Sequence, residues 1–482
     1  MTLADLLFAP TYEIAPDEVV VHVGEQAVTH RELIERAERV RDELVEAGVE
    51  PGMPVAVMLG NDAETIATLF GVWAAGAVYV PLNPRASDDE IARLLTLVPP
   101  ALILESQDPG IRGGESPKRG VGIGVGVGFG EVARYDADVA LVQMTSGTTG
   151  PPKPVLLTHS GVLALLDGVL HKVRGSGPAK RASTPNLIPV SLSLWAGIYN
   201  VCFALRVGAP IVLMERFEPA EFAALVARHS VRSVVLPPAA LAMLCDDNDI
   251  TSLEPLAWVR SITAPLSPFL VRRFHERFGI GVLNCYGQTE LGGEIVGWNA
   301  ADWREWSATK LGAVGRPHDG VEVRAEDDGE LVVRTPVLKA RSTDGIDLTD
   351  RMTANGWFRT GDIGSVDDDG FVWIEGRVSD QINRGGMKIT PAEVEEVLAT
   401  APGVREVAVV GVPDERLGEV PVAFVVPVDP STPPDPAALE AHCRAHLGPW
   451  KVPVRFETIA TLPRNEVGKV LKHELAESPG DR

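Results

Sequence analysis

The sequence predicts an α/β protein with a large N-terminal domain of helix-covered sheets and a small C-terminal α/β domain. Three observations support this fold class. The chain has 482 residues, more than a single hydrophobic core usually accommodates. Short apolar segments that favour strands alternate with segments that favour helices. The composition also shifts near residues 365–380, so we predict two domains, 1–378 and 379–482.

The first hundred residues show the alternation clearly. Thr29 and Glu32 form a capping box ahead of apolar residues at helical spacing, and Gly48 ends that helix. The elements expected next, in chain order, are a strand at 55–59, a helix at 63–75, a strand at 78–80 and a helix at 88–97. Strands separated by helices in this way predict parallel sheets covered by helices.

Two further stretches of the N-terminal half invite other interpretations. Residues 66–84 carry no charge over about the length of a membrane span. Gly71, Gly76 and Pro81 interrupt them, which favours a buried helix, a turn and a strand. Residues 120–130 have glycine at every second position but contain no Gly-x-Gly-x-x-Gly motif, so we predict a flexible linker or loop there.

The last hundred residues repeat the α/β pattern on a smaller scale. Thr390, Pro391 and Glu393 predict a helix that starts with a cap, a proline at its first position and a capping-box glutamate. The elements expected after it are strands at 407–412 and 422–426, a proline-rich linker at 429–436, a helix at 437–447 and a strand at 454–458. A segment of this size is large enough to form a domain of its own.

Composition excludes several classes of function. The formal net charge of -22, from 44 basic and 66 acidic side chains, would repel a phosphate backbone, so we expect no nucleic-acid partner. The first residues lack the basic and apolar regions of a signal peptide. The cysteines are far apart and form no CxxC pair, which argues against a disulfide framework or a zinc site and favours a reducing cytoplasm; they are Cys202, Cys245, Cys285 and Cys443.

A loop rich in glycine and hydroxyl groups is the first segment that suggests chemistry. An apolar, strand-like run at 139–144 leads into residues 145–153, Thr-Ser-Gly-Thr-Thr-Gly-Pro-Pro-Lys. Glycines let backbone N–H groups approach an anion, the hydroxyls donate further hydrogen bonds, and the lysine adds a cation. The loop does not fit the Walker A pattern. It predicts a polyphosphate site, the alternative being a plain surface turn.

This loop and four further segments together resemble the AMP-binding superfamily of acyl-CoA synthetases, nonribosomal-peptide adenylation domains and luciferases. The further segments are 284–290 (Asn-Cys-Tyr-Gly-Gln-Thr-Glu), 357–362 (Trp-Phe-Arg-Thr-Gly-Asp), 376–380 (Gly-Arg-Val-Ser-Asp) and 462–469 (Leu-Pro-Arg-Asn-Glu-Val-Gly-Lys). They occur in the order of the family, and the resemblance extends from about residue 20 to 475. A run of such motifs is far more specific than any one of them.

The resemblance implies an activity in two steps. ATP would activate an organic carboxylic acid as an acyl-adenylate with release of pyrophosphate, and the acyl group would then pass to the thiol of coenzyme A. ATP, Mg²⁺ and coenzyme A are the implied cofactors and co-substrates. The resemblance also implies that the small C-terminal domain is mobile and turns about a hinge at Ser379, and that Gly385 and Gly386 border the passage for the thiol arm.

Roles in the first step follow from the same motifs. Tyr286 offers an aromatic face to adenine, Asp362 and Arg377 suit the ribose, and Thr289 can donate to the α-phosphate. Glu290 is a hard oxygen ligand for Mg²⁺. Lys469 would stabilise the charge that develops as the carboxylate attacks phosphorus. The remaining nucleotide-binding candidates are Thr145, Ser146, Gly147, Thr148, Thr149, Gly150, Lys153, Ala264, Pro265, Asn284 and Gly287.

The acid-binding segment departs from the family pattern. Pro154 and the pair Ile262-Thr263 occupy positions where glycine is common, and Leu192 falls about where the family has an aromatic or histidine gate. The segment also lacks the aspartate that pairs with an α-ammonium, which argues against an amino acid, because a buried unpaired cation is costly. Pocket candidates mix aromatic and hydroxyl groups; they are Ser191, Ser193, Trp195, Asn200, Thr263 and Gly287.

Alternatives stay open at this point. The acceptor could be a carrier protein or an amine, or the activated group could be a different oxyacid such as nitrite. A non-catalytic nucleotide sensor and a luciferase are alternatives of another class. We expect a small-molecule acid as the partner, no integral membrane association and a cytoplasmic location, and we leave open a carrier-protein partner and a homodimer.

Overall fold

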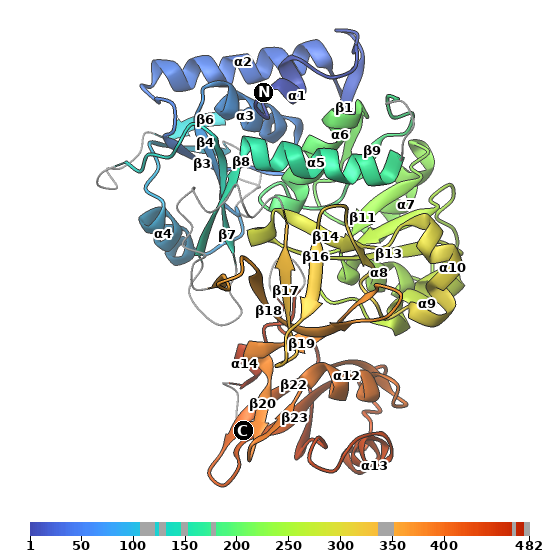
Figure 1. The fold of residues 1–482 in the computed structure, drawn as a ribbon. Coiled ribbons are helices and arrows are strands. Elements are labelled where there is room, and N and C mark those ends of the chain that lie inside the picture. The colour runs from blue at the N-terminus through green and yellow to red at the C-terminus, as the bar shows by residue number, and fades with distance from the viewer. Residues whose placement is uncertain are drawn as a thin grey trace.

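The structure is a computed structural model of the chain, and it describes residues 1–106, 121–124, 132–145, 153–174, 180–335, 351–464 and 469–476. Figure 1 shows a large upper body, coloured blue to yellow, and a smaller lower one, coloured orange to red. Within the described ranges no helix is long and apolar enough to cross a bilayer.

A six-stranded sheet near the N-terminus confirms the predicted alternation. Its order is β6-β5-β3-β4-β7-β8, and β3, β4, β5 and β7 pair in parallel. The strands are β3 (Pro54–Met58), β4 (Val78–Pro81), β5 (Leu102–Ser106), β6 (Val121–Gly124), β7 (Val139–Thr145) and β8 (Lys153–Thr158). The helices among them are α2 (His30–Glu46), α3 (Ala63–Ala74) and α4 (Asp88–Leu97). The capping box of α2 is present, with Thr29 and Glu32 bonded to each other's backbone N–H.

The prediction of a loop over residues 120–130 is wrong for part of the segment. Residues 121–124 form β6, which pairs antiparallel with β5 from Ser106↔Val121 to Ile103↔Gly124. Two of these four residues are β-branched, Val121 and Ile123, and a neighbouring strand edge supplies hydrogen-bond partners that glycine composition alone does not reveal.

A nine-stranded sheet forms the centre of the large body, in the order β15-β14-β13-β12-β11-β9-β10-β1-β2. Its strands are β1 (Val19–Val23), β2 (Gln26–Thr29), β9 (Asn186–Ile188), β10 (Ile211–Leu213), β11 (Ser233–Leu236), β12 (Trp258–Ser261), β13 (Gly281–Gln288), β14 (Gly293–Gly297) and β15 (Arg316–Pro317). Helix α5 (His159–Arg174) contacts β8 of the six-stranded sheet. The helices that follow it in the chain are α6 (Trp195–Val207), α7 (Pro219–Arg228), α8 (Pro238–Asp246), α9 (Pro268–Phe278) and α10 (Ala300–Lys310).

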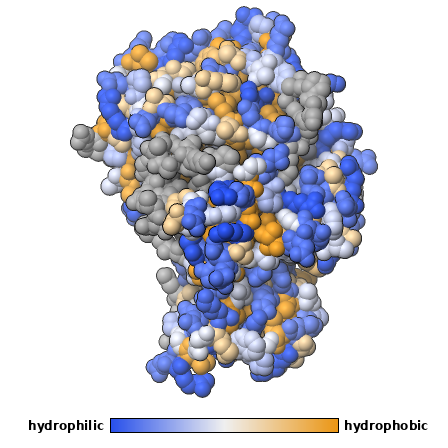
Figure 2. Space-filling view, viewed as in Figure 1, coloured by the Kyte–Doolittle hydropathy of each residue, from blue (hydrophilic) through white to orange (hydrophobic). Residues whose placement is uncertain are grey.

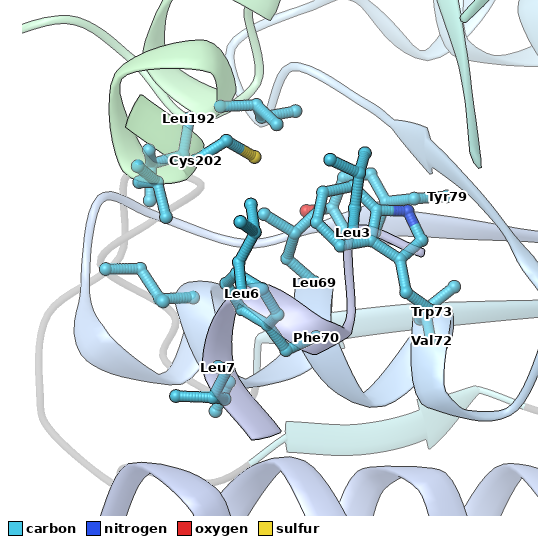
Figure 3. Packing of buried hydrophobic residues seen from close by; sticks show 14 of the residues in the cluster. Leu3, Leu6, Leu7, Leu69, Phe70, Val72, Trp73, Tyr79, Leu192 and Cys202 are labelled. Atoms are coloured by element: carbon cyan, nitrogen blue, oxygen red, sulfur yellow. The ribbon is translucent and has the colours of Figure 1, made fainter. Parts of the chain in front are cut away.

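The uncharged stretch at 66–84 lies in the protein core, as predicted. Ile66 and Phe70 are fully buried, and Tyr79 is 1% exposed. Figure 3 shows Phe70 and Tyr79 packed near Leu3 and Leu6, which belong to the N-terminal segment with the short helix α1 (Asp5–Phe8). This core therefore joins the first residues of the chain to α3 and β4.

A four-stranded antiparallel sheet follows, in the order β16-β17-β18-β19. Its strands are β16 (Glu322–Ala325), β17 (Glu330–Arg334), β18 (Phe358–Val366) and β19 (Val372–Arg377). β19 ends at the short 3-10 helix η4 (Val378–Asp380), the position of the predicted hinge. In Figure 1 this sheet lies between the larger body and the lower one.

The C-terminal elements form a sheet with its own core. β20 (Ile382–Arg384), β21 (Met387–Ile389), β22 (Val404–Asp414), β23 (Gly418–Pro427) and β24 (Arg455–Thr458) make up the sheet. Helices α12 (Pro391–Ala399), α13 (Pro436–His446) and α14 (Lys472–Ala476) accompany it. A cluster that includes Ile389, Val394, Leu439 and Cys443 is buried between sheet and helices. The strands predicted at 407–412 and 422–426 are confirmed within longer strands.

The predicted side-chain cap of α12 is wrong. Thr390 does precede the helix and Pro391 is its first residue, but the Thr390 side chain makes no capping hydrogen bond. The side chain of Glu393 instead receives the ammonium of Lys451, with 2.5 Å between Lys451 Nζ and Glu393 Oε1. A partner 58 residues away therefore replaces the local capping interaction.

Most of the face seen in Figure 2 is polar, with apolar residues scattered among the polar ones. This agrees with the strong acidic balance of the chain. All four cysteines are free thiols and buried.

Candidate active site

The predicted phosphate loop joins two paired strands. Thr145 ends β7 and faces Lys153, the first residue of β8, in the antiparallel register. Met144 faces Pro154 in the same ladder, so the proline that departs from the family pattern lies inside a strand. The loop candidates Ser146, Gly147, Thr148, Thr149 and Gly150 lie outside the described residues.

The segment 284–290 forms the end of β13 and the start of a 3-10 helix, η2 (Thr289–Leu291). Asn284 is buried, and its side-chain oxygen accepts the Cys285 N–H at 2.9 Å. Gly287 faces Glu294 of β14, and a Cβ added at Gly287 would lie 1.8 Å from the Gly293 carbonyl oxygen. Only glycine fits this close approach of two backbones.

Residues of two other predicted nucleotide motifs contact Asp362. It is 3% exposed, and its Oδ2 accepts hydrogen bonds from the Tyr286 hydroxyl at 2.6 Å and from Gln288 Nε2 at 2.7 Å. Arg377 Nε lies 2.9 Å from the other oxygen, Oδ1. Burial and the neighbouring Asp362 carboxylate raise the pKa of the Tyr286 phenol well above its usual value. Three motifs distant in sequence therefore converge on one carboxylate.

Arg351 connects Glu290 to the same region. Its guanidinium contacts Glu290 Oε1 at 3.2 Å and Gln288 Oε1 at 3.2 Å, and it donates to the Thr360 carbonyl at 2.7 Å. The guanidinium carbon also lies 4.2 Å from the centre of the Phe358 ring, a cation–π distance. An arginine that is remote in sequence thus links Glu290 to Gln288, which itself bonds Asp362.

Lys469 brings the C-terminal domain to the nucleotide motifs. Burial and the nearby Arg377 guanidinium lower its pKa to about 8, while the carboxylates of Asp380 and Asp362 act in the opposite direction. The last residues before the lysine, 465–468, lie outside the described residues, but Arg464 and Val470 form a β-bridge on either side of them. Lys469 is therefore close enough to Asp362 and Arg377 for their charges to affect the pKa of its ammonium.

The residues of the predicted hinge and thiol passage are exposed. Ser379 is exposed in η4, and its hydroxyl donates to Asp380 Oδ1 at 2.8 Å. Gly385 and Gly386 form the exposed turn between β20 and β21, with φ values of 60° and 88°. Only glycine adopts such backbone angles without strain, and no atom lies within 4 Å of a Cβ built at Gly386.

The acid-pocket candidates lie where α6, β12 and β13 meet. Trp195 is the first residue of α6, is 8% exposed, and donates to the Gly292 carbonyl at 3.0 Å. The hydroxyls of Ser191 and Ser193 are 2.8 Å apart. Thr263 is exposed just beyond β12 with an unusual φ of 86°, one of two non-glycine residues with positive φ in the described ranges. Ala264 and exposed Pro265 follow it in the same turn.

Two of the pocket expectations change in the structure. Asn200 is buried and donates to the Ala196 carbonyl at 2.8 Å, one turn earlier in α6, so it bonds within its own helix. Leu192 is 3% exposed and packs in the core near Cys202 (Figure 3). Its N–H donates to Asn61 Oδ1 at 2.7 Å, which fixes this segment to the loop after β3. Leu192 is therefore a core residue.

Sequence reasoning missed several residues of the site. Gln288 was part of a recognised motif without a role, yet it bonds Asp362 and the Thr360 carbonyl. Arg351 belongs to none of the motifs. Glu294 is half-buried and contacts Arg260 and His318, and no pattern marked any of the three. Only the alternation of residues on β14, which brings Glu294 opposite Gly287, could have suggested one of them.

Within the described ranges, no group of three or more His, Cys, Asp and Glu side chains is arranged to hold a metal ion. A site that relied on protein ligands alone would need such a group. Magnesium bound with a nucleotide does not, because phosphate oxygens and water fill most of its coordination shell.

Comparisons with known proteins agree with these motifs. A family profile described as AMP-binding enzyme matches residues 10–338, and one described as AMP-binding enzyme C-terminal domain matches residues 393–469.

The alignments with individual relatives cover most of this chain and most of each relative. A sulfoacetate–CoA ligase of Cupriavidus necator is 32% identical over 89% of this chain and 88% of its own length. A 2-succinylbenzoate–CoA ligase of Geobacillus kaustophilus is 31% identical over 96% of this chain and 95% of its own. Among solved structures, the amide bond synthetase McbA from Marinactinospora thermotolerans superposes with a TM-score of 0.80 at 29% identity, covering 98% of each chain.

Proposed function

The chain belongs to the family of AMP-binding enzymes, and from this premise we infer that it is an AMP-forming acid–thiol ligase that joins a carboxylic acid to coenzyme A at the expense of ATP. In the first step a carboxylate oxygen attacks the α-phosphorus, and the bond from that phosphorus to pyrophosphate breaks. In the second step the thiol sulfur bonds to the acyl carbon and AMP leaves. The observation that carries the proposal is the convergence of Asp362, Arg377 and Lys469 from separate motifs.

Asp362 and its partners would bind the nucleoside. A carboxylate accepts hydrogen bonds from both ribose hydroxyls. Because Tyr286 and Arg377 already contact its two oxygens, the ribose hydroxyls would replace or share these contacts, while Gln288 keeps the carboxylate oriented. The ring of Tyr286, whose hydroxyl is fixed by Asp362, is left to pack on adenine with Asn284 and the Ala264-Pro265 turn at the edge of the base. The strands on either side of residues 146–152 would place the hydroxyls of that loop on the phosphates.

Glu290 would hold magnesium together with the phosphates of ATP. It is a carboxylate on an accessible side chain, 24% exposed, beside Thr289 at the start of η2. One carboxylate is enough for a magnesium ion that is bound mainly by phosphate and water. The bound ion would neutralise phosphate charge. Thr289 would donate to the α-phosphate, and Arg351 would keep Glu290 beside it.

Lys469 would stabilise the transition state of the first step. The attack brings two anions together, and a buried ammonium between them lowers the barrier electrostatically. Burial also raises the strength of this interaction, because water screens it less. Two of the residues that affect the lysine, Asp362 and Arg377, are themselves proposed ribose ligands, so the lysine is within reach of the bound nucleotide.

The second step would use the turn at Gly385 and Gly386 after rotation about Ser379. The boundary between domains 1–378 and 379–482 falls beside η4, where β19 ends. An exposed, glycine-lined turn lets a thin thiol arm approach the backbone. We place the reaction in the cytoplasm, where ATP and coenzyme A are available and buried thiols stay reduced. A carrier-protein partner and a homodimer are not part of this proposal.

Coenzyme A is the acceptor that the curated relatives favour, since both are named as CoA ligases. The acids in their names, sulfoacetate and 2-succinylbenzoate, differ greatly, so the names leave the acid open. The pocket would be formed by Ser191, Ser193, Trp195, Thr263 and Gly287.

The test is pyrophosphate release from Mg-ATP across a panel of aromatic, alicyclic, sulfonated and aliphatic acids, each with and without coenzyme A, with products identified by mass spectrometry. We expect at least one acid to give the mass of its acyl-CoA. An acyl-adenylate that forms amides with added amines, but never a CoA adduct, would contradict the acceptor. The absence of pyrophosphate release with every acid would contradict the activation step as well.

A further inference from the structure

A partly buried group of polar side chains lies beside the proposed acid pocket and takes no part in the reaction described above. We refer to Arg260, Glu294 and His318 as the Glu294 cluster. Arg260 Nη1 lies 2.9 Å from both oxygens of Glu294, and His318 Nε2 lies 2.8 Å from Glu294 Oε1. Arg260 Nη2 also donates to the Trp298 carbonyl at 3.2 Å.

The strands place this cluster next to the pocket. Glu294 is paired with Gly287, a pocket candidate, across the β13–β14 ladder. Arg260 lies on β12, three residues before Thr263. Tyr199 provides a link to α6, because the charges of Glu294 and Arg260 act on its phenol and its ring centre is 5.8 Å from that of Trp195.

The charges of the cluster are retained inside the protein. Burial alone would raise the pKa of Glu294, but Arg260 and the hydrogen bond from His318 lower it to about 2, so the carboxylate is anionic at neutral pH. The side chains nevertheless keep some accessible surface, 22% for Arg260 and 10% for both Glu294 and His318. Apolar residues of similar volume often stabilise a protein as well as a buried ion pair does, so stability is a weak reason for such a cluster.

We propose that the Glu294 cluster determines acid specificity, by selecting substrates that carry an uncharged hydroxyl group in addition to the reacting carboxylate. This inference rests on the proposed function, since it assigns the substrate class of the same pocket. In this proposal the three side chains contact the body of the acid and not the reacting atoms.

The chemistry of the cluster favours a hydroxyl substituent over a hydrocarbon or a second anionic group. A hydrocarbon would offer no hydrogen bond to the accessible surface of these polar side chains, and a hydrogen-bonding site strongly disfavours an analogue that lacks the matching group. A second anion would approach the Glu294 carboxylate, while the charge of Arg260 is already compensated by that carboxylate. A hydroxyl can donate to a carboxylate, and hydrogen bonds to charged groups are the stronger ones.

The first part of the test uses the wild-type enzyme. The rate of acyl-CoA formation is measured for 3-phenylpropanoate and its three ring-hydroxylated forms, for hexanoate and 6-hydroxyhexanoate, and for hexanedioate as the second-anion case. We expect at least one hydroxylated acid to exceed its parent in kcat/KM by about ten- to a hundredfold, the effect of one hydrogen bond to a charged group. Equal or better use of the parent acids in every pair, or preference for hexanedioate, would overturn the inference while leaving the ligase activity established.

The second part asks whether the cluster causes the preference. Arg260→Leu combined with Glu294→Leu removes both charges together and so avoids leaving one of them unpaired. We expect this variant to lose the hydroxyl preference, so that each hydroxylated acid and its parent acid give similar values of kcat/KM. Glu322→Gln, which alters the exposed Arg334–Glu322 ion pair on β16 and β17, is the matched control and should keep the preference. A folded double variant, verified by its thermal melting curve, that retains the wild-type ratio would contradict the proposal.

Discussion

The Asp362 carboxylate accepts bonds from two side chains on one oxygen and meets a guanidinium on the other. At the scale of single residues, the sequence motifs assigned Tyr286, Asp362 and Arg377 to one nucleotide site, and the three side chains are in contact in the structure. Gln288 and Arg351 could not be assigned in that way. Their roles depend on partners 74 and 61 residues away, Asp362 and Glu290, and no local pattern encodes such a distance.

Replacing Lys469 by alanine should lower the rate of pyrophosphate release by about a hundredfold or more. In the proposed mechanism the ammonium acts on the transition state, so ATP binding should change little. Stopped-flow rates for pyrophosphate, together with calorimetric titration of ATP, measure the two quantities separately. Unchanged pyrophosphate release in the alanine variant would contradict the role of this lysine.

The activity should also depend on pH through the same side chain. Its pKa of about 8 means that the ammonium is lost as the pH rises above that value. We expect kcat/KM for ATP, which reports on the free enzyme, to fall about tenfold per pH unit between pH 8.5 and 9.5. Lys469→Arg keeps its charge in this range and should show a flat profile at lower activity. A wild-type profile that stays flat to pH 9.5 would contradict the assignment.

Elements with strong local signals were predicted well, and elements that depend on distant partners were not. The helix after Thr29 has the predicted capping box, since both of its partners lie within one turn. The similar signal at Thr390 produces no side-chain cap, and the Glu393 carboxylate pairs with the distant Lys451. In the glycine-rich stretch, a strand forms at 121–124 because β5 offers an edge for pairing.

In the turn between β20 and β21, the substitution Gly386→Val should slow thioester formation more than adenylation. Valine at a φ of 88° strains the turn and adds bulk to the proposed thiol passage. The control is Gly24→Val, an exposed glycine with φ of 57° and no atom within 4 Å of an added Cβ, which lies in the hairpin between β1 and β2. Single-turnover rates of acyl-adenylate and acyl-CoA formation make the comparison. Equal slowing of both steps in Gly386→Val would rule out a specific role in the second step.

For the whole molecule, composition and alternation were enough to predict the α/β class, with helix-covered sheets and a small C-terminal unit that has its own core. The division of residues 1–378 into three sheets was not predicted. Strands that pair across long separations, such as β1 with β10, leave no local trace of their neighbours. The same reason explains why the Glu294 cluster, assembled from β12, β14 and the turn after β15, emerged only in the structure.

Global stability should fall in acid partly through Glu294. The folded pKa of about 2 lies below the ordinary value of 4.5, so the stabilisation is complete above pH 4.5 and is lost as the pH falls towards 2. The loss attributable to this group is on the order of 3 kcal/mol. The free energy of unfolding in urea is measured between pH 5 and pH 3 for the wild-type protein and for the Arg260→Leu/Glu294→Leu variant. The difference between the two pH dependences isolates the contribution of Glu294. Identical pH dependence in both proteins would show that Glu294 does not contribute.

The central claim is that the acid is activated by direct bonding of its carboxylate oxygen to the α-phosphorus. The measurement that tests it is oxygen transfer from an ¹⁸O-labelled acid, identified in the substrate panel, to the products of one turnover with Mg-ATP and coenzyme A. We predict one ¹⁸O atom in AMP, because the bridging oxygen of the acyl-adenylate leaves with the nucleotide when sulfur attacks the acyl carbon. Unlabelled AMP, with the label in pyrophosphate or in inorganic phosphate, would contradict the account.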